Sequence, residues 1–373
     1  MGSTELVPTE QLREKLRRSS ELQRRAEKGC SLDSLRLGLG EIQSMISELE
    51  NLTVKDVHGL CVRIKRKKHA SSEDMFRLSH AFLQGDENIS EFVKNIGGIN
   101  VLVKELTGHD SELQIKACET LCNLSLGGSV PCEKIALNAG SYLVTYLDST
   151  DLRLKVSSLW VISNIAATGG KGLQALVALE IVPKLVQLWS TEQNEEILEE
   201  ISIALDLVVS SAVLRTEDKT ALRECLLKGS LKKTFGDYQL KLIFHSLITT
   251  DITLNETDLA TVVDLCTTAL RESEDLCKSG VLLKLLYSVR ILSNLICLYP
   301  SSATILVEKI GSSGVSLADA LNMLLERDEA VKEVLWFTKN LVSSENSDLK
   351  VYLQENGILQ ELKLGRFSVP GSL

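Results

Sequence analysis

The chain has 373 residues, of which 44% are hydrophobic and 24% charged, with five prolines and 4% aromatic residues. This composition is typical of a folded, soluble protein with a large core, and it favours helices over a β-sandwich. Charge is divided unevenly, since residues 1–70 carry a net charge of +4 and the rest of the chain −13. An acidic body argues against nucleic acid as its ligand and favours basic partners.

Residues 1–70 form a basic, largely helical first region. Residues 12–28 are expected to form a helix, and their cations include Arg13, Lys15, Arg17, Arg18, Arg24 and Arg25. A second basic run follows at Lys65, Arg66, Lys67 and Lys68. A charged surface helix and a solvated helix end are the simplest interpretations of these two features.

Internal repeats organise residues 71–365. Three segments align, residues 92–128, 134–170 and 175–211, and each contains two short apolar helices, a polar loop and a longer helix. One such unit cannot bury both of its faces, so neighbouring units bury them jointly. The sequence therefore predicts an all-α, right-handed armadillo-repeat superhelical solenoid of about seven repeats. A flexible tail is expected at residues 366–373.

A polar position on the longer helix of each unit sets the register of the repeats. It is first occupied by Asn123, Asn164 and Asp206, at steps of 41 and 42 residues. It then continues at steps of 40, 48 and 46 residues through Ser246, Asn294 and Asn340. A period of this size belongs to HEAT and armadillo repeats.

Tryptophan precedes two of these polar positions by four residues. Trp160 precedes Asn164, and Trp336 precedes Asn340. This spacing puts both side chains of a pair on one face of a helix. The third tryptophan, Trp189, lies outside the frame and is expected in the core.

The W-x-x-x-N spacing on the third helix of an armadillo unit resembles the importin-α family of nuclear-import adaptors. In that family the Asn side chain binds the backbone of an extended basic peptide, and the Trp rings form slots for Lys and Arg stems. An amide offers a donor and an acceptor to a peptide bond, and an indole attracts a cation. The resemblance implies a peptide-binding groove at Asn123, Trp160, Asn164, Asp206, Asn294, Trp336 and Asn340.

The residues themselves leave alternatives to this groove open. The two framed tryptophans are also compatible with core packing, and the asparagines with hydrogen bonds to a neighbouring helix. Importin-α has more repeats and more groove tryptophans than this chain. That departure indicates a narrower or different peptide preference.

The same resemblance extends to the first region. Residues 12–28 resemble a shortened importin-β-binding region, and the run Lys65–Lys68 resembles a nuclear localisation signal that would compete for the chain's own groove. The resemblance implies an adaptor for nuclear import in the cytoplasm and nucleus, with basic cargo peptides and importin-β as partners. An armadillo scaffold and a dedicated chaperone for a basic client remain open as alternatives.

No catalytic residue, metal site, cofactor or membrane span is expected. The five histidines lie at no spacing suited to a metal or a catalytic triad, and hydrolase, metalloprotease, P-loop and kinase signatures are absent. The nine cysteines are spread out without a C-x-x-C pair and indicate reduced thiols. The most apolar stretch, residues 281–299, contains Lys284 and Arg290, which argues against a span.

Overall fold

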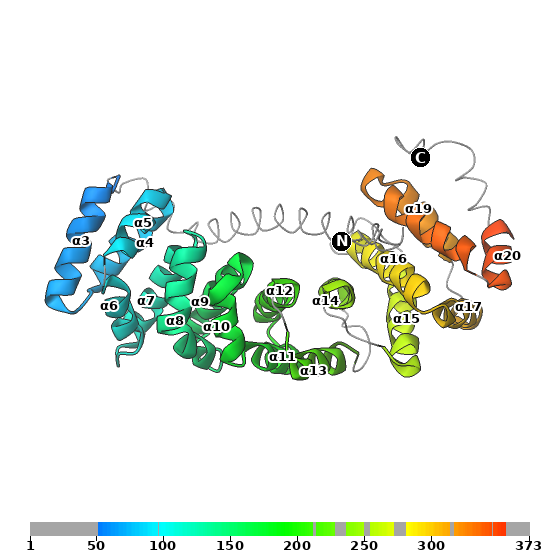
Figure 1. The fold of residues 1–373 in the computed structure, drawn as a ribbon, viewed down its shortest axis with the longest axis horizontal. Coiled ribbons are helices and arrows are strands. Elements are labelled where there is room, and N and C mark those ends of the chain that lie inside the picture. The colour runs from blue at the N-terminus through cyan, green and yellow to red at the C-terminus, as the bar shows by residue number, and fades with distance from the viewer. Residues whose placement is uncertain are drawn as a thin grey trace, which may run out of the picture. The chain divides into compact units, whose positions relative to one another are not determined.

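The structure is a computed structural model of the chain. It describes residues 51–95, 97–211, 214–227, 236–249, 254–271, 281–313, 317–344 and 346–355. Two compact units divide the chain, residues 1–185 and 186–373, and α11 (Ile181–Thr191) crosses the boundary between them. Every regular element in the described ranges is a helix (Figure 1), which confirms the predicted all-α fold.

The helices follow one another with short connections. Before α11, the described part of unit 1 contains α3 (Val54–Lys67), α4 (Ser72–Gln84), α5 (Asp86–Lys94), α6 (Gly98–Leu106), α7 (Ser111–Ser125), α8 (Ser129–Tyr146), α9 (Leu152–Thr168) and α10 (Gly170–Ala178). After α11, the described part of unit 2 contains α12 (Glu195–Ser211), α13 (Thr216–Leu227), α14 (Gly236–Thr249), α15 (Glu256–Arg271), α16 (Val281–Leu298), α17 (Ser301–Ser313), α18 (Leu317–Leu325), α19 (Asp328–Ser343) and α20 (Ser347–Glu355).

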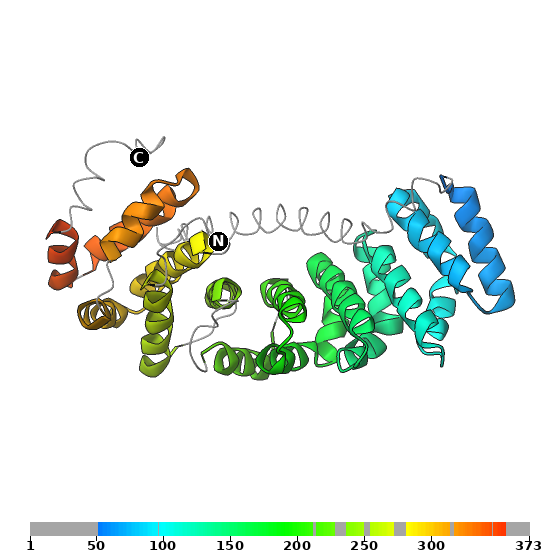
Figure 2. The same cartoon turned by 180° about the vertical axis from the view of Figure 1, so that it is seen from behind.

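The helices that carry the predicted polar position pack on one another within each unit, and α4 precedes the first of them. In unit 1, α7 packs against both α4 and α9, as Figures 1 and 2 show from two sides. In unit 2, α14 packs against α12 and α16, and α16 packs against α19. We call α4, α7 and α9 the ladder helices of unit 1, and α12, α14, α16 and α19 those of unit 2.

Aspartates fix the starts of α7 and α9. The Asp110 carboxylate accepts hydrogen bonds from the backbone amides of Glu112 at 3.0 Å and Leu113 at 3.1 Å. Asp151 does the same for α9, with the backbone amides of Arg153 and Leu154 as donors. Such a cap stabilises a helix by about 1 kcal/mol, because it satisfies amides that have no partner within the helix.

The ladder helices of unit 1 bury one side against the other helices of this unit. In this layer α5 packs on α4, α6 on α7, and α8 and α10 on α9. Leu121, Leu159 and Ile162 have no exposed surface, and burying each such side chain contributes about 1.5–3 kcal/mol. The opposite side of the ladder helices therefore carries the polar and charged residues that remain accessible.

The packed array begins earlier than the boundary predicted at residue 71. Helix α3 buries Val57, Leu60, Cys61 and Ile64 and packs against α4, α5 and α6. Its apolar stripe needs these neighbours, so α3 belongs to the solenoid rather than to a separate basic region. The expected helix at residues 12–28 and the tail at 366–373 lie outside the described residues.

Helix α16 is long and apolar enough to cross a membrane by length and composition, with a mean hydropathy of 1.8 over its 18 residues. Helices α10 and α11 meet the same test only as a pair bent by 70°. In this structure 56% of the α16 window is buried within the protein, and the helix packs against α14, α15 and α19. Its apolar character is thus used in the core of unit 2.

Candidate functional site

The predicted groove residues of unit 1 are Asn123, Trp160 and Asn164, and both asparagines link neighbouring ladder helices. The Asn123 Nδ2 on α7 donates to the Ser79 Oγ on α4 at 2.7 Å. The Asn164 Nδ2 on α9 donates to the Ser125 Oγ on α7 at 2.8 Å. The two asparagines are only 4% and 3% exposed. Their amide nitrogens therefore hold successive repeats together, which is the structural alternative that the sequence left open.

In unit 2 the same link recurs once with asparagine and once with a charged cluster. The Asn340 Nδ2 on α19 donates to the Ser293 Oγ on α16 at 2.8 Å. Asp206 on α12 forms ion pairs with Lys241, at 3.3 Å, and with His245, both on α14. Burial raises the pKa of Asp206, but the charges of His245 and Lys241 outweigh this effect and hold the pKa at about 2. Asp206 is an anion that is already neutralised by its own chain.

On α14 the His245 ring, which directly precedes the predicted position Ser246, contacts the preceding ladder residue Asp206 on α12. Asn294 on α16 remains partly exposed. The serines that receive the ladder hydrogen bonds were not identified from the sequence. Their signal is a serine about one repeat period before each asparagine.

The two framed tryptophans differ from the third in their exposure. Trp160 on α9 and Trp336 on α19 are partly exposed, and among the described residues neither indole N–H has a hydrogen-bond acceptor. Trp189 is 2% exposed and donates to the Ser202 Oγ at 3.0 Å, which confirms its predicted place in the core. Trp160 and Trp336 thus retain ring surface that a ligand can contact.

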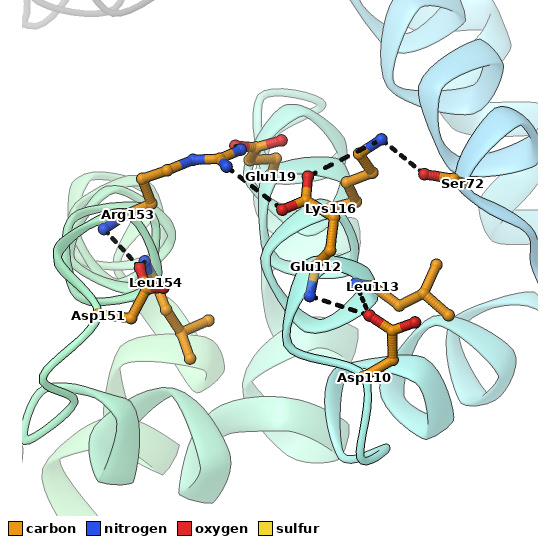
Figure 3. A network of polar contacts seen from close by, with 9 residues as sticks. All are labelled: Ser72, Asp110, Glu112, Leu113, Lys116, Glu119, Asp151, Arg153 and Leu154. Carbon is orange, nitrogen blue, oxygen red and sulfur yellow. Dashed lines mark hydrogen bonds and ion pairs between the residues drawn. The ribbon is translucent and has the colours of Figure 1, made fainter.

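A network of charges covers the exposed face of the ladder helices in unit 1 (Figure 3). Arg153 on α9 donates through Nη1 to the Glu112 Oε2 at 3.5 Å and through Nη2 to the Glu119 Oε1 at 3.1 Å. Lys116 on α7 donates to the Ser72 Oγ on α4 at 2.6 Å, and its Nζ lies 3.9 Å from the Glu112 Oε1. The hydrogen bond to Glu119 is the main cause that raises the pKa of Arg153 above its usual value.

A small depression lies between α4 and α7 beside this network, with a volume of about 50 Å³. Its lining combines apolar, polar and charged side chains. The lining side chains include Met75, Phe76 and Leu83 from α4 and Lys116, Glu119 and Asn123 from α7. It has room for the end of a side chain but not for a drug-sized ligand.

An internal arginine dominates the corresponding face of unit 2. The Arg290 Nη2 donates to the Glu333 Oε1 at 3.0 Å, and its guanidinium lies 5.7 Å from the ring centre of Phe244 and 5.6 Å from that of Tyr287. Two aromatic rings and a carboxylate together bind a cation strongly. Asn340 borders an open depression of about 740 Å³ elsewhere on this unit.

The basic run Lys65–Lys68 lies at the end of α3. The first three residues occupy the last turn of the helix, and Lys68 is its C-cap in a left-handed conformation, with φ of 51°. All four side chains are exposed. A run in a packed helix is not an extended segment along the ladder helices, so the interpretation as a competitor for the chain's own groove is corrected. A solvated helix end, stabilised by the helix dipole, describes it.

Within the described ranges no group of three or more His, Cys, Asp or Glu side chains is arranged to hold a metal ion. The seven predicted groove residues all lie on ladder helices, three in unit 1 and four in unit 2.

Comparisons with known proteins bear on the fold. No family model matches the sequence, and no curated protein matches it. The chain is similar in structure to an engineered protein solved by the Northeast Structural Genomics Consortium, with 23% identity and a TM-score of 0.60 over 78% of this chain and 69% of that one. This likeness supports the fold of an all-α solenoid.

Two designed armadillo repeat proteins are also similar, at a lower level. One was solved in complex with the peptide (KR)4 and shares 20% identity, with a TM-score of 0.41 over 72% of this chain and 91% of that one. The other shares 19% identity, also with a TM-score of 0.41, over 72% of this chain and 92% of that one.

Proposed function

We propose that this chain is a non-catalytic, protein-binding adaptor that recognises basic peptide segments on the exposed face of its ladder helices. The observation that carries the proposal is in unit 1. The partly exposed Trp160 ring on α9 occupies the same repeat position as Glu119 on the adjacent helix α7, and Glu112 lies two turns before Glu119 on that helix. An aromatic face beside carboxylates suits a Lys or Arg side chain.

The interactions available on this face decide how such a peptide would bind. The asparagine amide nitrogens already donate to serines of the preceding helix, and the two side chains are only 4% and 3% exposed, so they offer little access to a backbone clamp. Contacts of peptide cations with Trp160 and with carboxylates therefore supply most of the affinity. The net charge of −13 on residues 71–373 attracts basic segments at long range.

More specifically, we propose a role in nuclear import, as the resemblance to importin-α implies. In that role the basic segment at residues 12–28 binds importin-β, and the protein acts in the cytoplasm and the nucleus. The alternative is a dedicated chaperone for a single basic client. The internal neutralisation of Asp206 and Glu333 favours this alternative, because it reduces the charge that unit 2 offers to a generic basic signal.

Fluorescence anisotropy of a labelled bipartite basic peptide tests the proposal with the full chain. The Trp160→Ala variant is expected to weaken binding about 5- to 30-fold, corresponding to a cation–π loss of about 1–2 kcal/mol. Tyr142→Ala is the matched control, since Tyr142 is an aromatic residue of unit 1 that is 42% exposed on α8. A full chain that does not bind the peptide at low salt contradicts the proposal, as does an equal loss in both variants.

A further inference from the structure

Arg153 is an unusual component of the charged face in unit 1, because it lies where a ligand cation would be expected. It begins the exposed stripe of α9 that continues through Trp160, seven residues further along the same helix face. Its guanidinium reaches across to α7 and contacts Glu112 and Glu119 on the exposed face (Figure 3). The acidic acceptors of this face are therefore occupied by a side chain of the protein itself.

The geometry of this contact fits a guanidinium better than an ammonium group. Two different nitrogens, Nη1 and Nη2, donate to two different carboxylates, at 3.5 and 3.1 Å. The two glutamates lie seven residues apart on one face of α7, so that one planar fork bridges them. A lysine nitrogen is a single point of charge and presents no such fork.

We infer that Glu112 and Glu119 form an arginine-binding site that is filled by Arg153 in the free protein, and that an arginine side chain of a bound segment takes its place. This inference rests on the proposed function, since it names the side chain that the face selects. Arg153 is then a specificity-determining residue: it excludes weakly held cations and yields to a better-placed guanidinium.

The exposure of the three side chains makes such an exchange feasible. The side chains of Arg153 and Glu112 are 57% and 55% exposed, and that of Glu119 is 32% exposed. Pairs of this kind are held weakly, because solvent screens them and because the long side chains lose freedom in forming them. Arg153 can therefore leave without disturbing the core, in contrast to a buried pair.

The charge balance of this cluster is a second reason to expect that a peptide arginine replaces Arg153. Glu112, Glu119, Lys116 and Arg153 together carry no net charge. When Arg153 withdraws, this cluster has a net charge of −1, and only Lys116 remains to neutralise it. A guanidinium from a peptide restores the balance and can also place its stem against the Trp160 ring.

A purely structural role for Arg153 makes the opposite prediction. If Arg153 served only to tie α9 to α7, its removal would leave binding unchanged or weaken it. If it blocks an arginine site, its removal strengthens the binding of arginine peptides. The two roles are therefore separated by the sign of a change in affinity.

The experiment uses the full chain and two labelled peptides of equal length and charge, one with arginines and one with lysines at the basic positions. Arg153→Ala is expected to tighten the arginine peptide about 3- to 10-fold, the range given by one or two freed surface acceptors, with a smaller change for the lysine peptide. Adding Glu119→Gln to Arg153→Ala is expected to abolish the gain. Arg153→Gln, which keeps most of the side chain, is a second variant in case the alanine protein folds poorly.

Lys171→Ala is the matched control for net charge. Lys171 is 78% exposed and pairs with Glu133 at 3.7 Å, so its removal changes the charge of unit 1 by the same amount without affecting the α7–α9 face. An equal gain in this control overturns the inference, and so does an equal gain for the lysine peptide or a loss of affinity in the Arg153 variants. If neither peptide binds to the wild type or to any variant, the proposed function itself fails and the inference falls with it.

Discussion

The ladder asparagines are expected to act on stability more than on ligand binding, and Asn164 gives the sharpest test. Asn164 is 3% exposed, and its Nδ2 donates to the Ser125 Oγ at 2.8 Å, with Ser125 itself only 2% exposed. Asn164→Ala removes this hydrogen bond and leaves an acceptor buried without its donor. The loss of one such bond costs about 1–3 kcal/mol of the free energy of unfolding.

Urea denaturation followed by circular dichroism measures this cost for the transition in which unit 1 unfolds. The matched control is Asn138→Ala, because the Asn138 side chain is exposed on α8 and donates only to the Lys134 carbonyl one turn earlier. The control is expected to lose no more than about 0.5 kcal/mol, as is usual for surface positions.

A double-mutant cycle then identifies the partner. Asn164→Ala and Ser125→Ala are expected to be coupled by about 0.5–1.5 kcal/mol, because each substitution removes the same bond. Peptide affinity is expected to change little in Asn164→Ala. The reasoning is refuted if Asn164→Ala destabilises the protein no more than Asn138→Ala does while it abolishes peptide binding, since the asparagine would then serve the ligand.

Three further predictions concern unit 2 and the thiols. The folded pKa of Asp206, about 2, lies below the usual value of 3.8, so its pairs with His245 and Lys241 contribute stability above about pH 4 that is lost as the pH falls toward 2. Urea denaturation at different pH values should show about 2 kcal/mol of this loss, and the loss should be absent in Asp206→Asn. Arg290→Ala, which removes an ion pair and two ring contacts, is expected to lower the free energy of unfolding by about 1–3 kcal/mol, with Arg290→Lys intermediate. Burial raises the pKa of Cys118 to about 12, so alkylation of the native protein at pH 8 should modify the exposed Cys297 before Cys118, as mass spectrometry of peptides would report.

The periodicity of the sequence predicts well which residues lie on the long helices. The position of Asn123, Trp160 and Asn164 on long helices follows from a spacing of about 40 residues and from apolar residues at helical intervals. The two short helices expected before α9 are instead one continuous helix, α8, of 18 residues. The boundary at residue 71 was misplaced because the charges at the end of α3 conceal its apolar stripe, Val57, Leu60, Cys61 and Ile64.

Contacts between repeats are the part that the sequence does not predict. The reach of His245 and Lys241 on α14 to Asp206 depends on the rotation of α14 about its axis, which a repeat period does not specify. The serine acceptors of the ladder and the reach of Arg153 across to α7 depend in the same way on distances between helices. Through these contacts the asparagines link neighbouring repeats.

The two tryptophan positions are unequal in what they offer to a cation, and this bears on how a bipartite peptide could be held. At Trp160 the neighbouring carboxylates belong to surface pairs, with Glu112 and Glu119 side chains 55% and 32% exposed. At Trp336 the carboxylate three residues earlier, Glu333, is 18% exposed and is held by Arg290, which is 13% exposed. Breaking a largely buried pair leaves a desolvated charge and costs more than exchanging a surface pair. Under the proposed function, a second basic cluster is therefore expected to gain less at unit 2 than the first gains at unit 1. This difference favours the proposal of one short arginine-containing segment over two equivalent ones.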